Sequence, residues 1–134
     1  MLNNAVQRMR ITGDKDTSLA VFMVRDLAQK SGFRPIKTAV LCTAVSELTT
    51  NIVKYAEHGM VTAQLREQRH RKGIEVLVED KGPGIADLEM AMKDHVSTSG
   101  TLGLGLPGTQ RMVDDFELTS TPGQGTQVRI VVWD

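Results

Sequence analysis

The stretch MVTAQLREQRHRKGIEVLVED, residues 60–80, contains two apolar-rich runs separated by a polar centre. Residues 60–68 and 73–80 each have the length and the apolar content of a strand, and RHRKG between them has the character of a turn. Two strands with so short a link pair in antiparallel fashion, because a parallel pair needs a crossover of a dozen or more residues. The stretch therefore predicts a β-hairpin near the middle of the chain.

The N-terminal part of the chain predicts a strand followed by a helix. Residues 5–11 alternate apolar and polar side chains, which is typical of a strand with one solvent-exposed face. Residues 16–32 have apolar side chains at helical spacing, and Asp16 or Thr17 can cap the start of that helix. Gly32 suits its C-terminal end.

A second helix and four later elements complete the expected order. Pro35 suits the first turn of a helix, which we expect to run to about Tyr55. The later elements are a short helix over residues 86–94, a helix over 107–116 with Pro107 near its start, and strands over 116–121 and 126–134. The later strands come in consecutive pairs. We therefore predict an α/β two-layer sandwich, with a mixed, mostly antiparallel sheet and helices on one face, and not a doubly wound Rossmann sheet.

The composition indicates a single domain over residues 1–134. There are 16 basic and 16 acidic residues without a long block of either sign, which disfavours nucleic acid or a membrane as partner. The lone cysteine, Cys42, lies in an apolar stretch and indicates a buried, reduced thiol. Residues 1–16 lack the apolar core of a signal peptide and no later run has membrane-spanning length, so we expect a cytoplasmic protein.

The segment SGTLGLGLPG, residues 99–108, holds four glycines, with the spacing Gly103-x-Gly105-x-x-Gly108. Such spacing is typical of a loop that wraps phosphates. A Rossmann fingerprint also needs a strand before the glycines and an acidic residue after them, and a P-loop needs a lysine that is absent here. A protein-kinase glycine loop needs catalytic segments for which the chain has no room. Taken alone, the segment leaves a glycine-rich turn without a ligand as an equal alternative.

A polar strip lies on the second helix. Asn51 follows Glu47 by four residues and Lys54 follows it by seven, so the three share a helix face that borders apolar positions. An asparagine carbonyl is a hard oxygen ligand suited to Mg²⁺ that is shared with phosphates, and a carboxylate can orient or deprotonate a nucleophile. Lysine adds positive charge. The alternative is a solvated set of surface side chains.

Two further segments place polar groups where strands begin or end. Asp80 ends one strand and is followed by Gly82 and Gly84. Its carboxylate can accept a hydrogen bond from the amino group of adenine. The two glycines allow the backbone to approach the adenine ring closely. Thr126 follows the turn PGQG and can hydrogen-bond a base. The alternatives are an ordinary strand exit and a tight turn before the last strand.

These four pieces, in this order, resemble the Bergerat-fold ATPases shared by gyrase, histidine kinases and MutL. Glu47 and Asn51 match the N box, and the three glycine boxes match residues 80–84, 103–106 and 123–126. The resemblance covers almost the whole chain. The small size and the segments SELTTNIVKYA, EDKGPGI and STSGTLGLGLPG are most similar to small bacterial switch-protein serine kinases, the RsbT group.

The resemblance implies a role for each matched residue. Asn51 coordinates Mg²⁺, and Glu47 acts as base or orients the incoming hydroxyl. Asp80 binds the adenine amino group of ATP with support from Thr126. The remaining implied contacts are Gly82, Gly84 and Ile85 against the base, Lys54 on a phosphate, and backbone N–H groups of Gly103, Leu104, Gly105 and Leu106 on the phosphates. Residues 93–100 would form a short ATP lid. Many relatives carry a phenylalanine in this segment, whereas the nearest apolar residue here is Val96.

The same resemblance implies a Mg-ATP-dependent serine/threonine kinase that phosphorylates a STAS-domain antagonist protein in bacterial partner-switching stress signalling. Relatives of this kind can also activate a partner phosphatase. One alternative is an anti-sigma factor that inhibits an RNA polymerase sigma factor, because the motif residues are shared. Another is a detached histidine-kinase catalytic domain, although His58, His70 and His95 are scattered and no phosphoacceptor helix is present. The third alternative is a binding module whose nucleotide site is catalytically inactive, and the presence of Glu47 and Asn51 argues against it.

Overall fold

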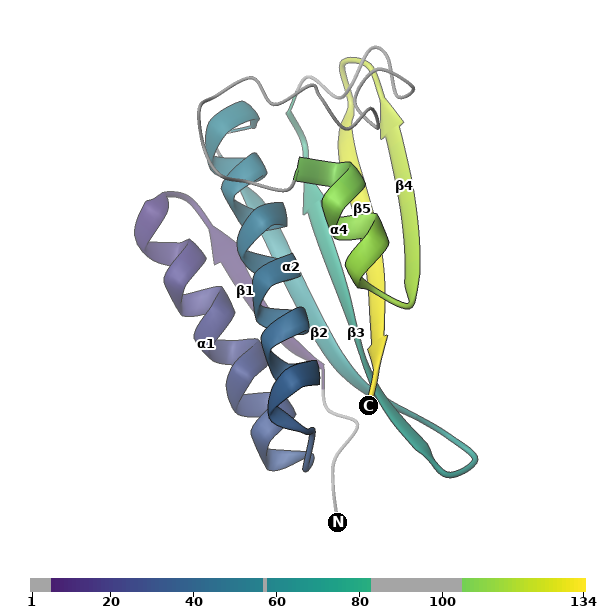
Figure 1. Ribbon diagram of the computed structural model, residues 1–134. Helices are drawn as coiled ribbons and strands as arrows, with labels where there is room; N and C mark the ends of the chain where they lie inside the picture. The colour runs from purple at the N-terminus through teal and green to yellow at the C-terminus, as the bar shows by residue number, and fades with distance from the viewer. Residues whose placement is uncertain (1–5, 57, 83–104) are drawn as a thin grey trace.

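The computed structural model describes residues 6–56, 58–82 and 105–134 (Figure 1). The elements within these ranges are β1 (Gln7–Ile11), α1 (Asp14–Lys30), α2 (Pro35–Tyr55), β2 (Gly59–Gln68), β3 (Arg71–Asp80), α4 (Gly105–Met112), β4 (Asp115–Thr121) and β5 (Gly125–Trp133). The short helix expected over residues 86–94 lies outside the described residues. None of the helices in these ranges is both long and apolar enough to cross a bilayer.

The strands form one sheet in the order β1-β2-β3-β5-β4, and each described pairing is antiparallel. The central hairpin is paired from Gly59 opposite Asp80 to Gln68 opposite Arg71. Its turn is therefore tighter than expected, with Arg69 in a left-handed conformation at φ 56°, because the two flanking strands extend almost to each other. The predicted two-layer fold, with an antiparallel-rich sheet, is confirmed.

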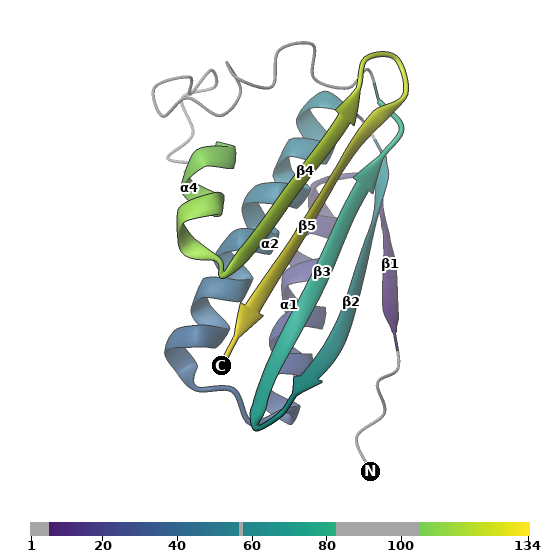
Figure 2. The same cartoon turned by 90° about the vertical axis from the view of Figure 1, so that its right-hand side faces the viewer.

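The helices all cover one face of this sheet (Figures 1 and 2). Alternate residues of β2 and of most of β3 and β5 are buried against them, as the period of two in a strand requires, and Val131 on the opposite face of β5 is buried as well. The largest fully buried side chains on these strands include Leu65, Ile74 and Ile130. The helix-covered face of these three strands is therefore the core face.

The start of α1 differs from the expected one. The helix begins at Asp14, with Gly13 as an N-cap that makes no side-chain capping bond, so the prediction that Asp16 or Thr17 caps the helix is wrong. The Asp16 carboxylate instead accepts hydrogen bonds from the backbone N–H (2.7 Å) and the hydroxyl (2.8 Å) of Thr12. These bonds lower the pKa of Asp16 and tie the first helical turn to the segment that follows β1.

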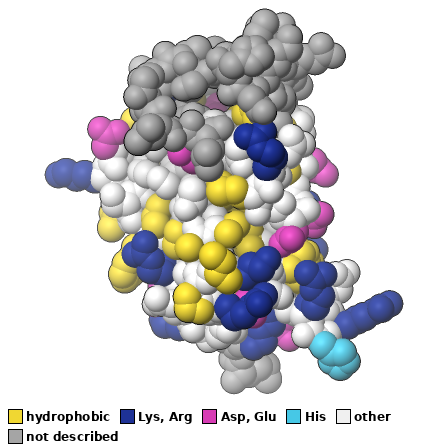
Figure 3. Space-filling model, viewed as in Figure 1, with side chains coloured by type: hydrophobic (Ala, Val, Ile, Leu, Met, Phe, Trp, Pro, Cys, Tyr) yellow, Lys and Arg dark blue, Asp and Glu magenta, His cyan; other side chains and the backbone are white. Residues whose placement is uncertain are grey.

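The packing of α2 against α1 buries Cys42, as the sequence predicts. Its Sγ lies 4.0 Å from the carbonyl oxygen of Val21 on α1, and burial raises the pKa of the thiol. The outward side of the helical layer mixes hydrophobic with charged side chains (Figure 3). Phe22 and Ile36 are the most exposed large hydrophobic residues described, at 63% and 66%.

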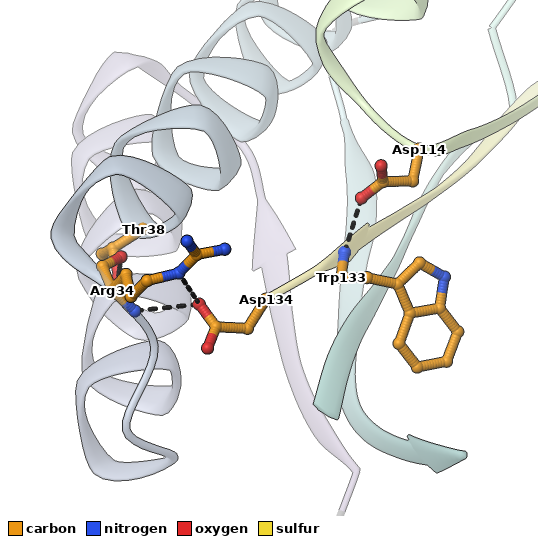
Figure 4. A network of polar contacts seen from close by, with 5 residues as sticks. All are labelled: Arg34, Thr38, Asp114, Trp133 and Asp134. Carbon is orange, nitrogen blue, oxygen red and sulfur yellow. Dashed lines mark hydrogen bonds and ion pairs between the residues drawn. The ribbon is translucent and has the colours of Figure 1, made fainter. Parts of the chain in front are cut away.

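The end of β5 is fastened to the start of α2 (Figure 4). Oδ1 of Asp134 accepts hydrogen bonds from the backbone N–H of Arg34 at 2.9 Å and from its Nε at 3.4 Å. Arg34 directly precedes Pro35, the first residue of α2. Nearby, the backbone N–H of Trp133 donates to Oδ2 of Asp114 at 2.6 Å. The Asp134 contacts tie the start of α2 to the end of β5, and the Asp114 contact ties the segment before β4 to the same end.

The helix α4 begins and ends earlier than the expected range of residues 107–116. Gly105 and Leu106 form its first turn, and Pro107 is its third residue. The helix ends at Met112 because the chain then joins the sheet: the backbone N–H of Asp114 donates to the carbonyl of Val131 on β5 at 3.0 Å. β4 follows from Asp115.

Candidate functional site

One residue from each strand lies in a single cross-strand row near one end of the sheet. Ile11 pairs with Gly59, Gly59 with Asp80, Asp80 with Thr126, and Thr126 with Ser120. Strand alternation places these residues on the helix-covered face. The row is apolar on the β1 side, where Ile11 is fully buried, and polar on the β4 side. We refer to Asp80, Thr126 and Ser120 as the polar row.

The Asp80 carboxylate is held by two backbone groups. Its Oδ1 accepts hydrogen bonds from the N–H of Gly82 at 2.9 Å and from the N–H of Thr126 at 3.2 Å. No hydrogen bond to its Oδ2 comes from the described part of the chain. One oxygen thus fixes the side chain, and the other can accept a hydrogen bond from a ligand.

The hydroxyls of Thr126 and Ser120 complete the polar row. Their oxygen atoms are 3.0 Å apart, and the Ser120 hydroxyl also donates to the carbonyl of Gly125 at 3.2 Å. The sequence analysis did not select Ser120. Hairpin pairing across the PGQG turn was the signal that could have found it, because that register sets Ser120 opposite Thr126.

Two glycines are required by close backbone approaches around Asp80. A Cβ on Gly82 would lie 2.7 Å from the Cβ of Ala56, just after the end of α2. A Cβ on Gly125 would lie 2.1 Å from the carbonyl oxygen of Asp80, and Gly125 has φ +121°. Side chains at these positions would push β3 away from α2 and from β5. The glycines therefore keep the Asp80 carboxylate near the C-terminal end of α2.

Glu47 and Asn51 lie on the flank of α2 that faces α4. Cys42 faces α1, and Asn51 follows it by nine residues, or two and a half turns, which places Asn51 on the opposite side of the helix. α2 lies between α1 and α4 (Figure 1). Glu47 and Asn51 are both half-buried, and Lys54 is exposed. The amide and the carboxylate thus lie on the α4-facing side of α2, on the turns that lead to Asp80.

The remaining expected contacts fall partly outside the described residues. Gly84, Ile85, Gly103 and Leu104 lie there, as does the expected lid over residues 93–100. Gly105 and Leu106, expected to present backbone N–H groups from a loop, instead form the first helical turn of α4. N–H groups in a first turn have no intrahelical acceptor, so their contact with phosphates stays a prediction. α4 begins at the end of the molecule where α2 ends (Figures 1 and 2).

A hollow of about 970 Å³ opens mainly on the other face of the sheet. It is lined by outward-facing side chains of all five strands, among them Arg8, Thr62, Leu77, Thr119 and Gln127. All three members of the polar row, Asp80, Thr126 and Ser120, also line it. The hollow therefore reaches the polar row, and none of the described residues that line it belongs to α2.

The chain matches a known domain family and proteins of two named activities. The histidine kinase-like ATPase domain family matches residues 14–132. The chain is 40% identical to the serine/threonine-protein kinase RsbT of Bacillus subtilis over 125 residues, which cover 93% of the chain and 94% of that protein. It is 31% identical over 134 residues to the anti-sigma F factor of Caldanaerobacter subterraneus, with coverages of 96% and 92%.

Solved structures share the fold. The RsbU and RsbW domains of a Mycobacterium tuberculosis protein align with a TM-score of 0.65 and 16% identity, over 94% of this chain and 32% of that one. The mycobacterial sensor histidine kinase MprB aligns with a TM-score of 0.54 and 16% identity, over 96% and 97%. The chain belongs to the histidine kinase-like ATPase domain family. The similarity to the RsbT group is confirmed by the identity along nearly its full length.

Proposed function

We propose that the chain is a Mg-ATP-dependent serine/threonine-protein kinase that phosphorylates a STAS-domain antagonist protein in a bacterial partner-switching pathway, in the cytoplasm. The observation that carries the proposal is the 40% identity to the RsbT kinase over 93% of the chain. The polar row and the α2 flank support it, because each supplies groups that one part of the reaction needs.

Asp80 is the adenine-binding residue in this proposal. Its Oδ1 is occupied by two backbone N–H groups, and its Oδ2 accepts a hydrogen bond from the 6-amino group of the purine. Thr126 stands beside it in the row and supplies a second acceptor. The proposal also assigns Gly82, Gly84 and Ile85 to the base, and a glycine there would leave room for backbone to approach the ring.

Asn51 is the proposed metal ligand. The described residues contain no group of three or more His, Cys, Asp or Glu that could hold a metal. Mg²⁺ needs no such cluster when it is bound through one or two protein oxygens, water and substrate phosphates. The half-buried amide of Asn51 fits that donor set. Bound there, the ion would neutralise charge on the phosphates, while Lys54 and the first N–H groups of α4 contact phosphate oxygens.

Glu47 orients the serine hydroxyl of the partner protein. In the reaction a new bond forms between the serine oxygen and the γ-phosphorus, the bond to the bridging oxygen of ADP breaks, and the hydroxyl proton passes to the Glu47 carboxylate or to water. The transition state of such transfers is loose, so positioning contributes more than strong base catalysis. Glu47 lies about one helical turn before Asn51 on α2, which suits a hydroxyl delivered beside the metal.

An anti-sigma factor is the second candidate function, because the anti-sigma F relative aligns over 96% of the chain at 31% identity. In that case the nucleotide site controls binding of an RNA polymerase sigma factor. Activation of a partner phosphatase remains a further proposal for the kinase. Both candidates share the nucleotide site and differ in the protein that docks beside it.

Incubation with γ-labelled ATP, Mg²⁺ and a STAS-domain protein encoded nearby tests the proposal. We expect label on a serine of the STAS protein, stable to acid, and no label when Mg²⁺ is chelated. Acid-labile label would indicate phosphohistidine and contradict the proposal. Co-purification with a sigma factor, without transfer to any STAS protein, would favour the anti-sigma candidate.

A further inference from the structure

The β2–β3 hairpin ends in a basic tip, at the end of the sheet away from the polar row. Residues 66–72 have the sequence REQRHRK, and all seven are exposed. Within the described residues, the pairing of β3 with β5 begins only at Gly73 opposite Trp133. Residues 66–72 therefore extend from the sheet as a two-stranded ribbon (Figure 1), and Lys and Arg side chains gather at this end of the molecule (Figure 3). We refer to residues 66–72 as the basic tip.

Three cations of the basic tip are held in place although they are exposed. Nη1 of Arg66 lies 3.3 Å from a carboxylate oxygen of Glu75. The guanidinium carbon of Arg71 lies over the ring of Trp133, 5.1 Å from its centroid. Nζ of Lys72 donates to a backbone carbonyl just after α1 at 3.3 Å. Such exposed contacts add little to stability, but they reduce the side-chain entropy that is lost when a partner binds.

The turn of the basic tip places an arginine where the backbone disfavours one. Arg69 has φ 56°, and a two-residue hairpin turn that needs a positive φ favours glycine or asparagine at that position. No ion pair joins Arg69 to any residue that the structure describes. Its guanidinium is thus presented to solvent at the expense of backbone strain, and strain of this kind points to a function of the side chain.

We propose that the basic tip is a docking surface for an acidic segment of a partner protein, in which Asp and Glu side chains are concentrated. Arginine and carboxylate groups form charge-assisted hydrogen bonds that are often bidentate. Arginine and tryptophan are also enriched among the residues that dominate protein interfaces. Arg71 and Asp80 are at opposite ends of β3, about 30 Å apart along an extended strand. A protein docked at the tip therefore leaves the nucleotide site open.

Two other anionic partners fit the basic tip less well. Sites for single-stranded nucleic acid offer aromatic rings on which bases stack. The ring of Trp133 is already in contact with the chain, because Arg71 lies over it and a Cβ on Gly73 would be 2.5 Å from it. Segments that bind membranes carry apolar side chains that insert between lipids, and residues 66–72 include none. An acidic protein segment needs neither feature.

Fluorescence anisotropy with labelled octaglutamate and octaglutamine peptides, at physiological ionic strength, tests the inference on the full chain. The unmodified chain should bind octaglutamate and not octaglutamine. Arg69→Gly should weaken that binding by about threefold and raise the urea midpoint, because glycine adopts a positive φ without strain. Arg69→Lys, which keeps the charge, should bind like the unmodified chain. The double variant Arg69→Gly, Arg71→Gln should bind at least about tenfold more weakly.

Arg10→Gln is the matched control, because Arg10 is an exposed arginine that pairs with Met60 at the other end of β2. Its affinity for octaglutamate should be unchanged. Equal weakening in Arg10→Gln, or an unchanged affinity in the double variant, overturns the inference, as does an unmodified chain that does not bind octaglutamate. Tighter binding of a single-stranded DNA octamer, lost in the double variant, overturns it in favour of nucleic acid. ATP affinity should be the same in all variants, so the proposed function is tested separately.

Discussion

The backbone N–H of Thr126 donates a hydrogen bond of 3.2 Å to Oδ1 of Asp80, across 46 residues of sequence. The bond joins the end of β3 to the start of β5. Since Gly82 donates to the same oxygen, the carboxylate is fixed by two segments that meet only in the folded sheet. The orientation of the proposed base-binding group is therefore a property of the β3–β5 pairing as well as of the Asp80 loop.

Asp80→Asn should lower ATP affinity by about tenfold to a hundredfold, the range for a hydrogen bond to a charged group. The amide oxygen can still accept the two backbone N–H groups. Its NH₂ group then stands in place of Oδ2 and sets a donor against the 6-amino group. Isothermal titration calorimetry measures the change. Glu79→Gln, one residue earlier and on the opposite face of β3, is the matched control, and equal affinities in both variants would count against the assignment.

Gly125→Ala should be far more destabilising than Gly123→Ala, although both glycines have positive φ and belong to the same turn. A Cβ at Gly123 meets nothing within 4 Å, whereas one at Gly125 would overlap the Asp80 carbonyl. We expect a loss of about 1 kcal/mol for Gly123→Ala from backbone strain, and about 3 kcal/mol or more for Gly125→Ala from strain and overlap together. Urea denaturation measures both, and similar losses would show that the close approach is wrong.

Asp134→Ala should lower the free energy of unfolding by about 1 kcal/mol at pH 7, because two hydrogen bonds to Arg34 are lost and the site is partly open to solvent. The backbone N–H of Arg34 lowers the pKa of Asp134 in the folded chain. This contribution is therefore complete above the unfolded pKa of about 3.9 and is lost as the pH falls through the lower folded value.

Urea denaturation of Asp134→Ala at pH 7 and below pH 3 checks the sign of that effect. The difference between the unmodified chain and the variant should shrink in acid. Asp115→Ala, which removes an exposed carboxylate from β4, should show no such change. A difference that stays constant between the two pH values would contradict the described contact.

The sheet could be predicted from the sequence because its pattern is local. Apolar content and a short link identify residues 60–80 as a hairpin, and pairing between β4 and β5 follows from the PGQG turn. The boundaries of two helices could not be predicted as well. α1 begins before Asp16 because that carboxylate bonds Thr12, and α4 ends early because Asp114 already bonds β5. Both depend on contacts that helical periodicity does not encode.

Part of the candidate site could be predicted from the sequence. Spacing alone puts Glu47 and Asn51 on one face of α2, and the resemblance assigns them to one site with Asp80 and Thr126. The direct contact between Asp80 and Thr126 depends on the register of β3 and β5, which the sequence does not specify. Ser120 was missed because a lone serine in a strand has the same local pattern whether it faces solvent or a neighbouring hydroxyl.

Single-turnover phosphotransfer by Glu47→Gln is the most direct test of the kinase account. The substitution keeps the size of the side chain and removes its charge, so ATP affinity should change less than about twofold while transfer to the STAS-domain serine slows at least about a hundredfold. Glu67→Gln, an exposed residue of β2, should transfer at the unmodified rate. An unchanged transfer rate in Glu47→Gln, or a loss of ATP affinity that matches the loss of transfer, would contradict the account.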